Sequence, residues 1–435
     1  MTRRDALDRT LRPLGAIVQA QTKPASRQPP GAQRLRCALV GFGRRGLDLA
    51  RAAAGVPQMA IVAVADAYDG RLERAREVLG ASIATVREAS AVIRRADVDA
   101  VLVATPDHLH TTHIALALDA GKPVYCEHPI AHTKDELSRF QSALSEATLT
   151  AGGGVLPAAI AGAAREIVRE GRLGEVTLVT GWWDTGTALD AWVLPFPPDA
   201  SSESIDWNAF AHASSAFDPA HFFRWPVFSR YGSGMIGARF VPQLWDIHRV
   251  LGLSRPEKCT AAGRLVRWRD GRDTPDVLHT TFEHTNVVID LGATLNGSGR
   301  AQEIRLIGGD ATLVLRKDGL ELIPQSTAEP FANLGDTWAE PHRRWVFMMH
   351  GLTPQGAIRG TPPVEKAAEQ YTLPTAGHEL TPTLSAFVEA ARSGKPAPGL
   401  LPATAADVAR AGLMCAAAVA SGRSVTHGDV VGDAP

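Results

Sequence analysis

Three glycines directly after an apolar run are the first indication of chemistry in this chain. The run from Cys37 to Val40 leads into Gly41, Gly43 and Gly46, spaced G-x-G-x-x-G, and a helical pattern follows at once. In such a turn the first glycine permits a tight bend and the second lets backbone N–H groups approach a pyrophosphate. The third lets the helix pack closely on the strand. The cofactor-binding residues predicted here are Gly41, Phe42, Gly43, Arg44, Arg45 and Gly46.

An acidic residue follows at the distance that a dinucleotide site requires. A second apolar run, Ile61 to Ala65, ends in Asp66, twenty residues after Gly46. A carboxylate there accepts hydrogen bonds from an adenosine ribose and repels a 2′-phosphate, so NAD is expected in preference to NADP. The side chains of Arg44 and Arg45 could reach cofactor phosphates and soften that preference.

Composition excludes several other classes of function. The net charge is −1 and the pI is about 6.9 over 435 residues, so there is no basic footprint for nucleic acid or for an anionic membrane. No uninterrupted apolar run reaches the roughly 18–20 residues that span a bilayer. The four cysteines lie far apart without a Cys-x-x-Cys pair, which indicates buried thiols rather than zinc ligands or disulfides. No metal site is expected, either from the cysteines or from the histidines at 108, 110 and 113.

The N-terminal segment allows two interpretations. Arg3-Arg4 faintly resembles the start of a twin-arginine export signal, but charged residues at 8, 9 and 12 interrupt what should be its apolar region. Residues 21–33 are rich in Pro, Gln and Ser and are typical of a linker. We therefore expect residues 1–33 to be a disordered tail or a degenerate export signal. The expected location is the cytoplasm, with the periplasm as the alternative.

The remaining pattern predicts an α/β protein of two domains. Residues 34–153 alternate strand and helix, as in a parallel doubly wound sheet, and Thr133 with Glu136 forms a capping box for one helix. Residues 154–435 contain a series of short strand-like runs separated by turn signals, which predicts a large, mostly antiparallel open sheet. The expected architecture is an N-terminal Rossmann dinucleotide-binding domain followed by a C-terminal α/β domain for substrate binding and oligomerisation.

Several motifs in the right order then resemble the glucose–fructose oxidoreductase, inositol dehydrogenase and MocA (Gfo/Idh/MocA) family. Residues 104–110, ATPDHLH, are similar to the family's A-T-P-x-x-x-H segment, and residues 120–129, AGKPVYCEHP, are similar to A-G-K-x-V-x-x-E-K-P. Residues 206–210, 217–219 and 222–225 resemble a sugar-processing branch. The resemblance covers roughly residues 35–425.

This resemblance implies a bound nicotinamide cofactor, a sheet commonly used for dimerisation, and oxidation of a ring hydroxyl in a sugar, a cyclitol or a derivative. It adds further cofactor contacts from the two motifs, namely Thr105, Pro106, His110, Glu127 and His128. The substrate contacts that we expect are Arg224, Trp225, Arg239 and Gln243.

The positions that usually handle the proton differ from the family pattern. The family Lys is His128 here, and the family Asp and His fall on Ala238 and Pro242, neither of which can titrate. Residues 154–157, GVLP, replace a polar substrate-facing run. In one interpretation His128, with an unperturbed pKa near 6.5, acts as the base, and Asp246 or His248 has a secondary role.

In the other interpretation the chain binds the cofactor without turnover, as a partner subunit or a ligand-binding regulator. Our prediction is the first, an NAD(P)-dependent oxidoreductase that transfers hydride between nicotinamide and a hydroxyl carbon of a sugar, cyclitol or glycoside. The expected partners are a sugar-like small molecule and further copies of the chain, or else an active paralogue. The expected catalytic residues are His128, Asp246 and His248.

Overall fold

The computed structural model describes residues 14, 17, 33–143, 149–211, 216–299, 302–325, 337–352, 367–373, 380–396 and 401–430. The interpretation of residues 1–33 as a tail or export signal therefore lies almost wholly outside the described residues. Leu14 and Ile17 are described, and both are buried in the hydrophobic core. These two residues are packed rather than free in solvent.

The N-terminal half forms a six-stranded sheet in the order β3-β2-β1-β4-β5-β6, and all its pairs are parallel. Its strands are β1 (Leu35–Val40), β2 (Met59–Ala65), β3 (Ala84–Val86), β4 (Ala100–Val103), β5 (Val124–Cys126) and β6 (Leu149–Ala151). The helices are α2 (Arg44–Ala54), α3 (Asp69–Leu79), α4 (Ala89–Ile93), α5 (His110–Asp119) and α6 (Lys134–Ala143). β4 and β5 are buried along their whole length because helices cover both faces, which explains their continuous apolar sequences. The predicted doubly wound fold is confirmed.

The capping box expected at the start of α6 is present. The Glu136 N–H donates to Thr133 Oγ1 at 3.2 Å, and the Thr133 N–H donates to Glu136 Oε2 at 3.3 Å. The same carboxylate accepts from the His132 N–H at 2.8 Å. These bonds satisfy backbone donors that the first turn of a helix leaves without intrahelical partners.

The C-terminal half forms a nine-stranded sheet in the order β14-β13-β12-β11-β7-β10-β9-β8-β15. Only the β10–β7 pair is parallel, so the predicted, mostly antiparallel sheet is also confirmed. The strands are β7 (Val176–Asp184), β8 (Lys258–Arg264), β9 (Val277–Glu283), β10 (Val288–Thr294), β11 (Gln302–Gly308), β12 (Ala311–Arg316), β13 (Gly319–Pro324), β14 (Glu369–Thr372) and β15 (Val425–Thr426).

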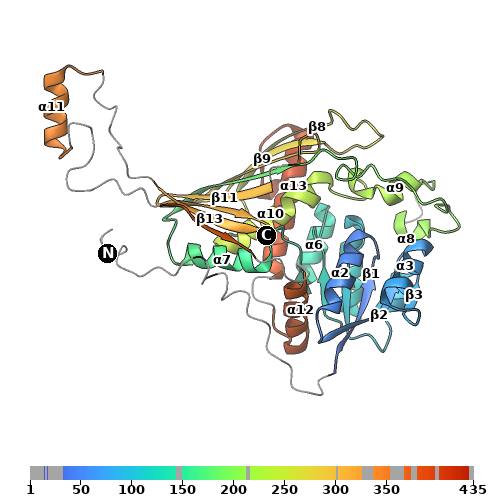
Figure 1. Ribbon diagram of the computed structural model, residues 1–435. Helices are drawn as coiled ribbons and strands as arrows, with labels where there is room; N and C mark the ends of the chain where they lie inside the picture. Colours follow the sequence, from blue (N-terminus) through green and yellow to red (C-terminus); the bar gives the residue numbers. More distant parts are fainter. Residues whose placement is uncertain are drawn as a thin grey trace.

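One face of this sheet is covered by α7 (Ala158–Arg169), α10 (Val241–Leu251) and α13 (Pro402–Ser421), and these helices lie between the sheet and the Rossmann domain (Figure 1). The other face is open and exposes Trp182, Val277 and Val288. β9 alternates plainly between exposed and buried residues. The open face is therefore mixed in character rather than continuously apolar.

The two halves share helices. α12 (Thr381–Ser393) packs against α2, and its Leu384 and Phe387 belong to the same buried cluster as Leu39 and Leu49 of the first domain. A division at residue 153 therefore separates the two sheets but not the two cores. Among the described residues, α13 is one helix with the length and mean hydropathy of a membrane span. Its packing on β8 and α10 accounts for that apolar composition.

The remaining described helices are short or peripheral: α8 (Trp207–Ala211), α9 (Pro219–Phe223), α11 (Glu340–Met349) and α14 (His427–Val430). Figure 1 shows α8 and α9 on the side of the molecule where α3 and β3 lie. Backbone hydrogen bonds join these regions, since the Asp206 N–H donates to Ala67 O and the Asp69 N–H donates to Ser204 O. The second domain thus reaches over the end of the Rossmann sheet.

Candidate functional site

A cavity of about 530 Å³ lies between the two domains, at the carboxyl ends of β1, β2, β4 and β5. This is where open parallel sheets bind their ligands. Its wall from the second domain comes from Gly154, Val155, Trp192, Leu194, Ala209, Phe210, Phe222, Phe223, Trp225, Pro226, Gly237, Ala238, Arg239, Pro242 and Lys317. Most of the predicted cofactor residues line it, namely Gly41, Gly43, Arg44, Arg45, Asp66, Thr105, Pro106, His110, Glu127 and His128.

The three glycines have the separate roles that their spacing predicts. Gly41 has a φ of +90°, and a Cβ there would lie 2.5 Å from Ala104 O. A Cβ on Gly46 would lie 2.0 Å from Gly41 O, so helix and strand touch at backbone level. A Cβ on Gly43 would meet nothing nearer than the Arg71 guanidinium, 3.7 Å away. The space above Gly43 is therefore open to the cavity, as a pyrophosphate on the helix N-terminus requires.

Asp66 organises the loops around this space. Its Oδ2 accepts a hydrogen bond from the Phe42 N–H at 2.7 Å, and its Oδ1 accepts one from the Tyr68 N–H at 3.0 Å. Phe42 was predicted to bind cofactor, but its ring is buried and its N–H donates to Asp66, so it shapes the turn instead. The Arg71 guanidinium lies 3.7 Å from Oδ1 and stacks over the Phe222 and Phe223 rings. Gly46, likewise predicted, does not line the cavity and serves packing alone.

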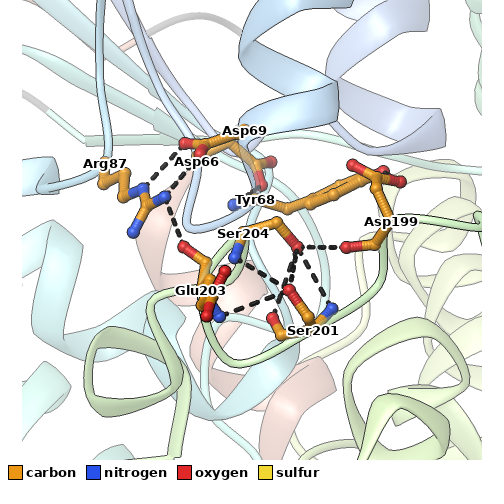
Figure 2. A network of polar contacts seen from close by, with 8 residues as sticks. All are labelled: Asp66, Tyr68, Asp69, Arg87, Asp199, Ser201, Glu203 and Ser204. Carbon is orange, nitrogen blue, oxygen red and sulfur yellow. Dashed lines mark hydrogen bonds and ion pairs between the residues drawn. The ribbon is translucent and has the colours of Figure 1, made fainter.

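A polar network closes the end of the cleft near Asp66 (Figure 2). The Arg87 guanidinium binds the Asp69 carboxylate in two places and donates to Glu203 O. Tyr68 Oη donates to Asp199 Oδ1 at 2.6 Å, which ties the loop after β2 to the second domain. Because Arg87 lines the cavity, this network both joins the domains and places a positive charge near the adenosine end of the proposed cofactor site.

The opposite end of the cofactor cleft is built on an ion pair. Arg45 Nε lies 2.9 Å from Glu127 Oε1, and Tyr125 Oη donates to the same oxygen at 2.8 Å. Burial lowers the pKa of Arg45 while the Glu127 charge raises it, and the net direction is upward. His110 has a positioning role, because its ring nitrogens lie 2.6 Å from Pro129 O and 2.8 Å from Thr105 O. It thereby holds the two family-like segments together.

His128 lines the cavity beside Glu127, but its electrostatics differ from our expectation. Its ring lies 4.7 Å from the Trp245 ring, and its Nε2 is buried without a hydrogen-bond partner in the described part of the protein. Burial, and then the positive charge of Arg45, lowers its pKa to about 3. The assumption of an unperturbed pKa near 6.5 is therefore wrong, and the imidazole is neutral at physiological pH.

The other two predicted catalytic residues do not line the cavity. Asp246 Oδ2 accepts from the Val155 and Leu156 N–H groups at 2.7 and 2.9 Å, behind the loop that forms the cavity wall. Burial raises the pKa of Asp246 to about 6. His248 is buried 5.3 Å from the His284 ring, and burial lowers its pKa to about 3. The structure does not bring His248 to the cleft, which corrects the expectation of a proton-handling role.

Ala238 and Pro242 do line the cavity, so the positions that the resemblance identified face the site without a titratable group. Of the predicted substrate contacts, Trp225 and Arg239 line it. Arg224 and Gln243 do not: the Arg224 guanidinium donates to Leu194 O, and Gln243 Nε2 donates to Arg239 O. Their roles are to fix the backbone beside the cavity.

The cavity-lining residues that were not predicted include Arg71, Trp192 and Lys317. Arg71 lies five residues after Asp66, in the first turn of α3, close enough in sequence to have been considered with it. Trp192 lies in an irregular segment and Lys317 in a turn between two strands, where the sequence indicated only a reversal of the chain. Their convergence is a property of the fold.

Comparison with known proteins agrees with this geometry. Residues 35–153 match the Gfo/Idh/MocA family, described as an oxidoreductase family with an NAD-binding Rossmann fold. Over these residues, the nucleotide-binding domain of this chain is similar to that of the Gfo/Idh/MocA family. The match to an NAD-binding Rossmann fold confirms the expected cofactor, NAD. The glycine turn, Asp66, Arg45 and Glu127 line the cavity described above, and their contact with the cofactor stays a prediction.

Similarity to individual proteins is partial in sequence and extensive in fold. The inositol 2-dehydrogenase of Rhizobium meliloti is 34% identical over 148 residues, which is 34% of this chain and 44% of that protein. The chain thus matches less than half the length of this relative. A levoglucosan dehydrogenase solved with NADH has 19% identity and a TM-score of 0.63, over 91% of this chain and 99% of that one. An oxidoreductase domain protein from Kribbella flavida has a TM-score of 0.66 at 16% identity, over 91% and 99% of the two chains. The two-domain fold is therefore shared along nearly the whole chain.

Proposed function

We propose that this protein is an NAD-dependent oxidoreductase of the Gfo/Idh/MocA family acting on a hydroxyl carbon of a sugar, a cyclitol or a related polyol. The observation that carries the proposal is the continuity of the cavity from the glycine turn to the second domain. A ligand between Trp192 and Ala238 would share that cavity with a nicotinamide near Glu127 and His128. The partial matches to inositol 2-dehydrogenase and the fold shared with levoglucosan dehydrogenase support this substrate class.

The bound cofactor supplies the hydride acceptor, and the chain must handle the proton. His128 is suited to this because its neutral Nε2 has no protein partner and the ring lines the cavity. Because Nε2 is buried, the imidazole has to turn toward the cavity before Nε2 can accept a hydrogen bond from the substrate hydroxyl. A base with a pKa of about 3 is weak towards an alcohol. As hydride leaves the carbon, however, the hydroxyl becomes a far stronger acid than imidazolium, so the proton passes to Nε2.

The other residues near His128 position it and exclude water. A Cβ on Gly153 would lie 3.2 Å from His128 Cδ2, so the glycine permits close packing of this loop on the imidazole. Trp245 covers the other side of the ring. The Arg45–Glu127 pair fixes the preceding residue. Nothing in the comparisons favours the alternative of a pseudoenzyme.

The decisive experiment is NAD+ reduction across a panel of sugars, cyclitols and sugar acids, with NADH absorbance as the readout. We expect turnover with some member of the panel, and a loss of about 100-fold or more in kcat for His128→Ala. His342→Ala, on the exposed surface of α11, is the matched control and should leave kcat unchanged. NAD binding without turnover of any member would overturn the proposal, and full activity of His128→Ala would move the base elsewhere.

We also propose that the chain forms a homo-oligomer through the open face of the nine-stranded sheet. Trp182 is 44% exposed at the centre of this face, on β7, with Val288 of the neighbouring strand 38% exposed. Light scattering should give at least a dimer at micromolar concentration, and Trp182→Glu should shift it towards monomer because a buried charge without a partner is costly. A monomeric wild-type protein would contradict the proposal.

A further inference from the structure

Trp192 lies beside the substrate end of the cavity in an unusual backbone conformation. Its φ is 57°, a left-handed value, and it is the one residue other than glycine with positive φ in the described part of the chain. This conformation crowds the Cβ of an L-residue, and such strain persists only where surrounding structure imposes it. The loop is held by hydrogen bonds from Ala191 N–H to Thr187 O, from Val193 N–H to Ala188 O and from Arg272 to Ala191 O. The strain presents the Trp192 ring to the cavity.

The group that this ring contacts is the guanidinium of Arg239. Its central carbon lies 5.2 Å from the Trp192 ring centre and 4.9 Å from the Trp183 ring centre, so it is flanked by two indoles. Its Nε is buried without a hydrogen-bond partner, and no carboxylate of a described residue lies within ion-pair distance of it. Asp190 is the acid whose charge reaches it, and burial nevertheless lowers the pKa of Arg239.

Local sequence explains why Arg239 faces the cavity. Residues Ile236–Phe240 form a single π-helical turn before α10, and such turns are frequent at functional sites. Pro242 lacks the N–H that would donate to Ala238 O in a regular α-helix. Arg239 thus lies between two cavity-lining residues, Ala238 and Pro242, at which the resemblance placed an acid and a base.

A second positive group lies against the same tryptophan. Lys317, in the turn between β12 and β13, has its Nζ 5.8 Å from the Trp183 ring centre and lines the cavity. No described carboxylate forms an ion pair with it. The Trp183 Nε1 is also buried without a partner. Two cations from two different elements therefore lie against one indole whose own N–H has no partner. The hydrogen bond found for the Arg239 guanidinium is a long one, from Nη1 to Ala238 O at 3.5 Å.

A guanidinium with no ion-pair partner and a buried, unpartnered Nε is costly, and stacking on indoles compensates only in part. A planar anion would replace the hydrogen bonds to water that burial removes from the guanidinium, since the two N–H groups of the guanidinium fork match the two oxygens of a carboxylate. We propose that the substrate is a polyhydroxylated acid whose carboxylate binds Arg239 and Lys317 beside Trp183. This inference deepens the proposed function and depends on it for the identity of the site.

The charge balance favours a carboxylate over a phosphate ester. Arg239 and Lys317 contribute two positive charges, and Asp190 offsets part of them. The net positive charge that remains suits a ligand with one negative charge rather than the roughly two that a phosphate monoester carries near neutral pH. The guanidinium carbon of Arg239 already packs on two indoles, so a carboxylate would bind the N–H groups in the plane of the guanidinium.

The test measures binding and turnover separately. Calorimetric titration of the NADH-loaded protein would compare three matched pairs, D-glucuronate with D-glucose, D-galacturonate with D-galactose, and D-gluconate with D-glucitol. D-glucose 6-phosphate is the phosphate arm. We expect the acid of at least one pair to bind about 10- to 100-fold more tightly than its neutral partner, the range for charge-assisted hydrogen bonds. Turnover with NAD+ would be measured on the same compounds.

Substitutions at Arg239 and Lys317 test whether these two residues cause the preference for the acid. Arg239→Gln should abolish the difference in affinity between the acid and its neutral partner, and Arg239→Lys should keep part of that difference. Lys317 lies in an exposed turn, so Lys317→Gln should not impair folding. It should weaken acid binding by about 3- to 10-fold. Arg169→Gln, which removes an equivalent charge from the exposed surface of α7, is the control and should change nothing.

The outcomes separate this inference from the proposed function. Tight binding of an acid without turnover would overturn the oxidoreductase proposal and keep the anion site. Turnover of neutral sugars with no preference for acids would support the oxidoreductase proposal and overturn the anion site. Equal binding of acid by Arg239→Gln and the wild type, preference for the phosphate, or no binding of any acid would each overturn the inference.

Discussion

The roles of the glycines in the dinucleotide turn can be separated by two alanine substitutions three residues apart. A methyl group on Gly43 would meet no protein atom closer than 3.7 Å and would enter the space proposed for the pyrophosphate. A methyl group on Gly46 would lie 2.0 Å from Gly41 O, a backbone atom that cannot move independently of its strand. The first change should therefore impair binding, and the second should impair folding.

The expected magnitudes differ accordingly. Gly43 has a φ of −70°, which alanine adopts without strain, so a small loss at the helix cap and a small gain from a stiffer unfolded chain should nearly cancel. We expect a change in stability within about 0.5 kcal/mol but at least about a tenfold loss of NAD affinity. Gly46→Ala must separate helix from strand by about 1 Å, and overpacking of that kind costs roughly 1–3 kcal/mol.

Calorimetry measures both quantities on the same samples. A loss of about 2 kcal/mol should lower the Tm of a domain of this size by about 4–8 °C for Gly46→Ala. Gly43→Ala should melt with the wild type while its NAD titration weakens. Wild-type NAD affinity in Gly43→Ala, or a wild-type Tm in Gly46→Ala, would refute the reasoning that assigns one glycine to the ligand and the other to packing.

Three further predictions concern charge. Because burial places the pKa of His128 at about 3, the imidazole stays unprotonated at all moderately acid pH values. The acid limb of kcat/KM should then show no inflection near pH 6.5, and a tenfold fall per pH unit below that value would mean that a different group, or a solvated His128, is the base. Asp66→Asn removes the negative charge beside Arg71, so affinity for NADP relative to NAD should rise about tenfold or more, and an unchanged ratio in titrations would show that Asp66 does not discriminate. Asp246 has its pKa raised from 3.8 to about 6, so the folded state holds a proton that the unfolded chain releases in this window. Stability should therefore fall as pH rises from about 4 to 6, by up to roughly 3 kcal/mol, and Asp246→Asn should flatten this dependence in denaturant titrations.

The sequence by itself determined the nucleotide-binding half of the protein. The functions of Gly41, Gly43 and Gly46 depend on one local turn, so their spacing suffices to predict them, and Asp66 follows at the distance set by one helix and one strand. The capping box at Thr133 and Glu136 is local for the same reason. The two-sheet architecture followed from the change of hydrophobic pattern near residue 154.

Only the tertiary structure decided the chemistry of the other half. The pKa of His128 depends on burial beside Trp245, which belongs to a helix more than a hundred residues away. Asp246 and His248 follow Pro242 on one helix, but the helical period turns them behind the cavity wall and into the core. Arg239, Trp192 and Lys317 meet because a π-helical turn, a strained loop and a strand turn converge at one end of the sheet. Spacing along the sequence does not predict these contacts, because they arise from packing between elements that are distant in sequence.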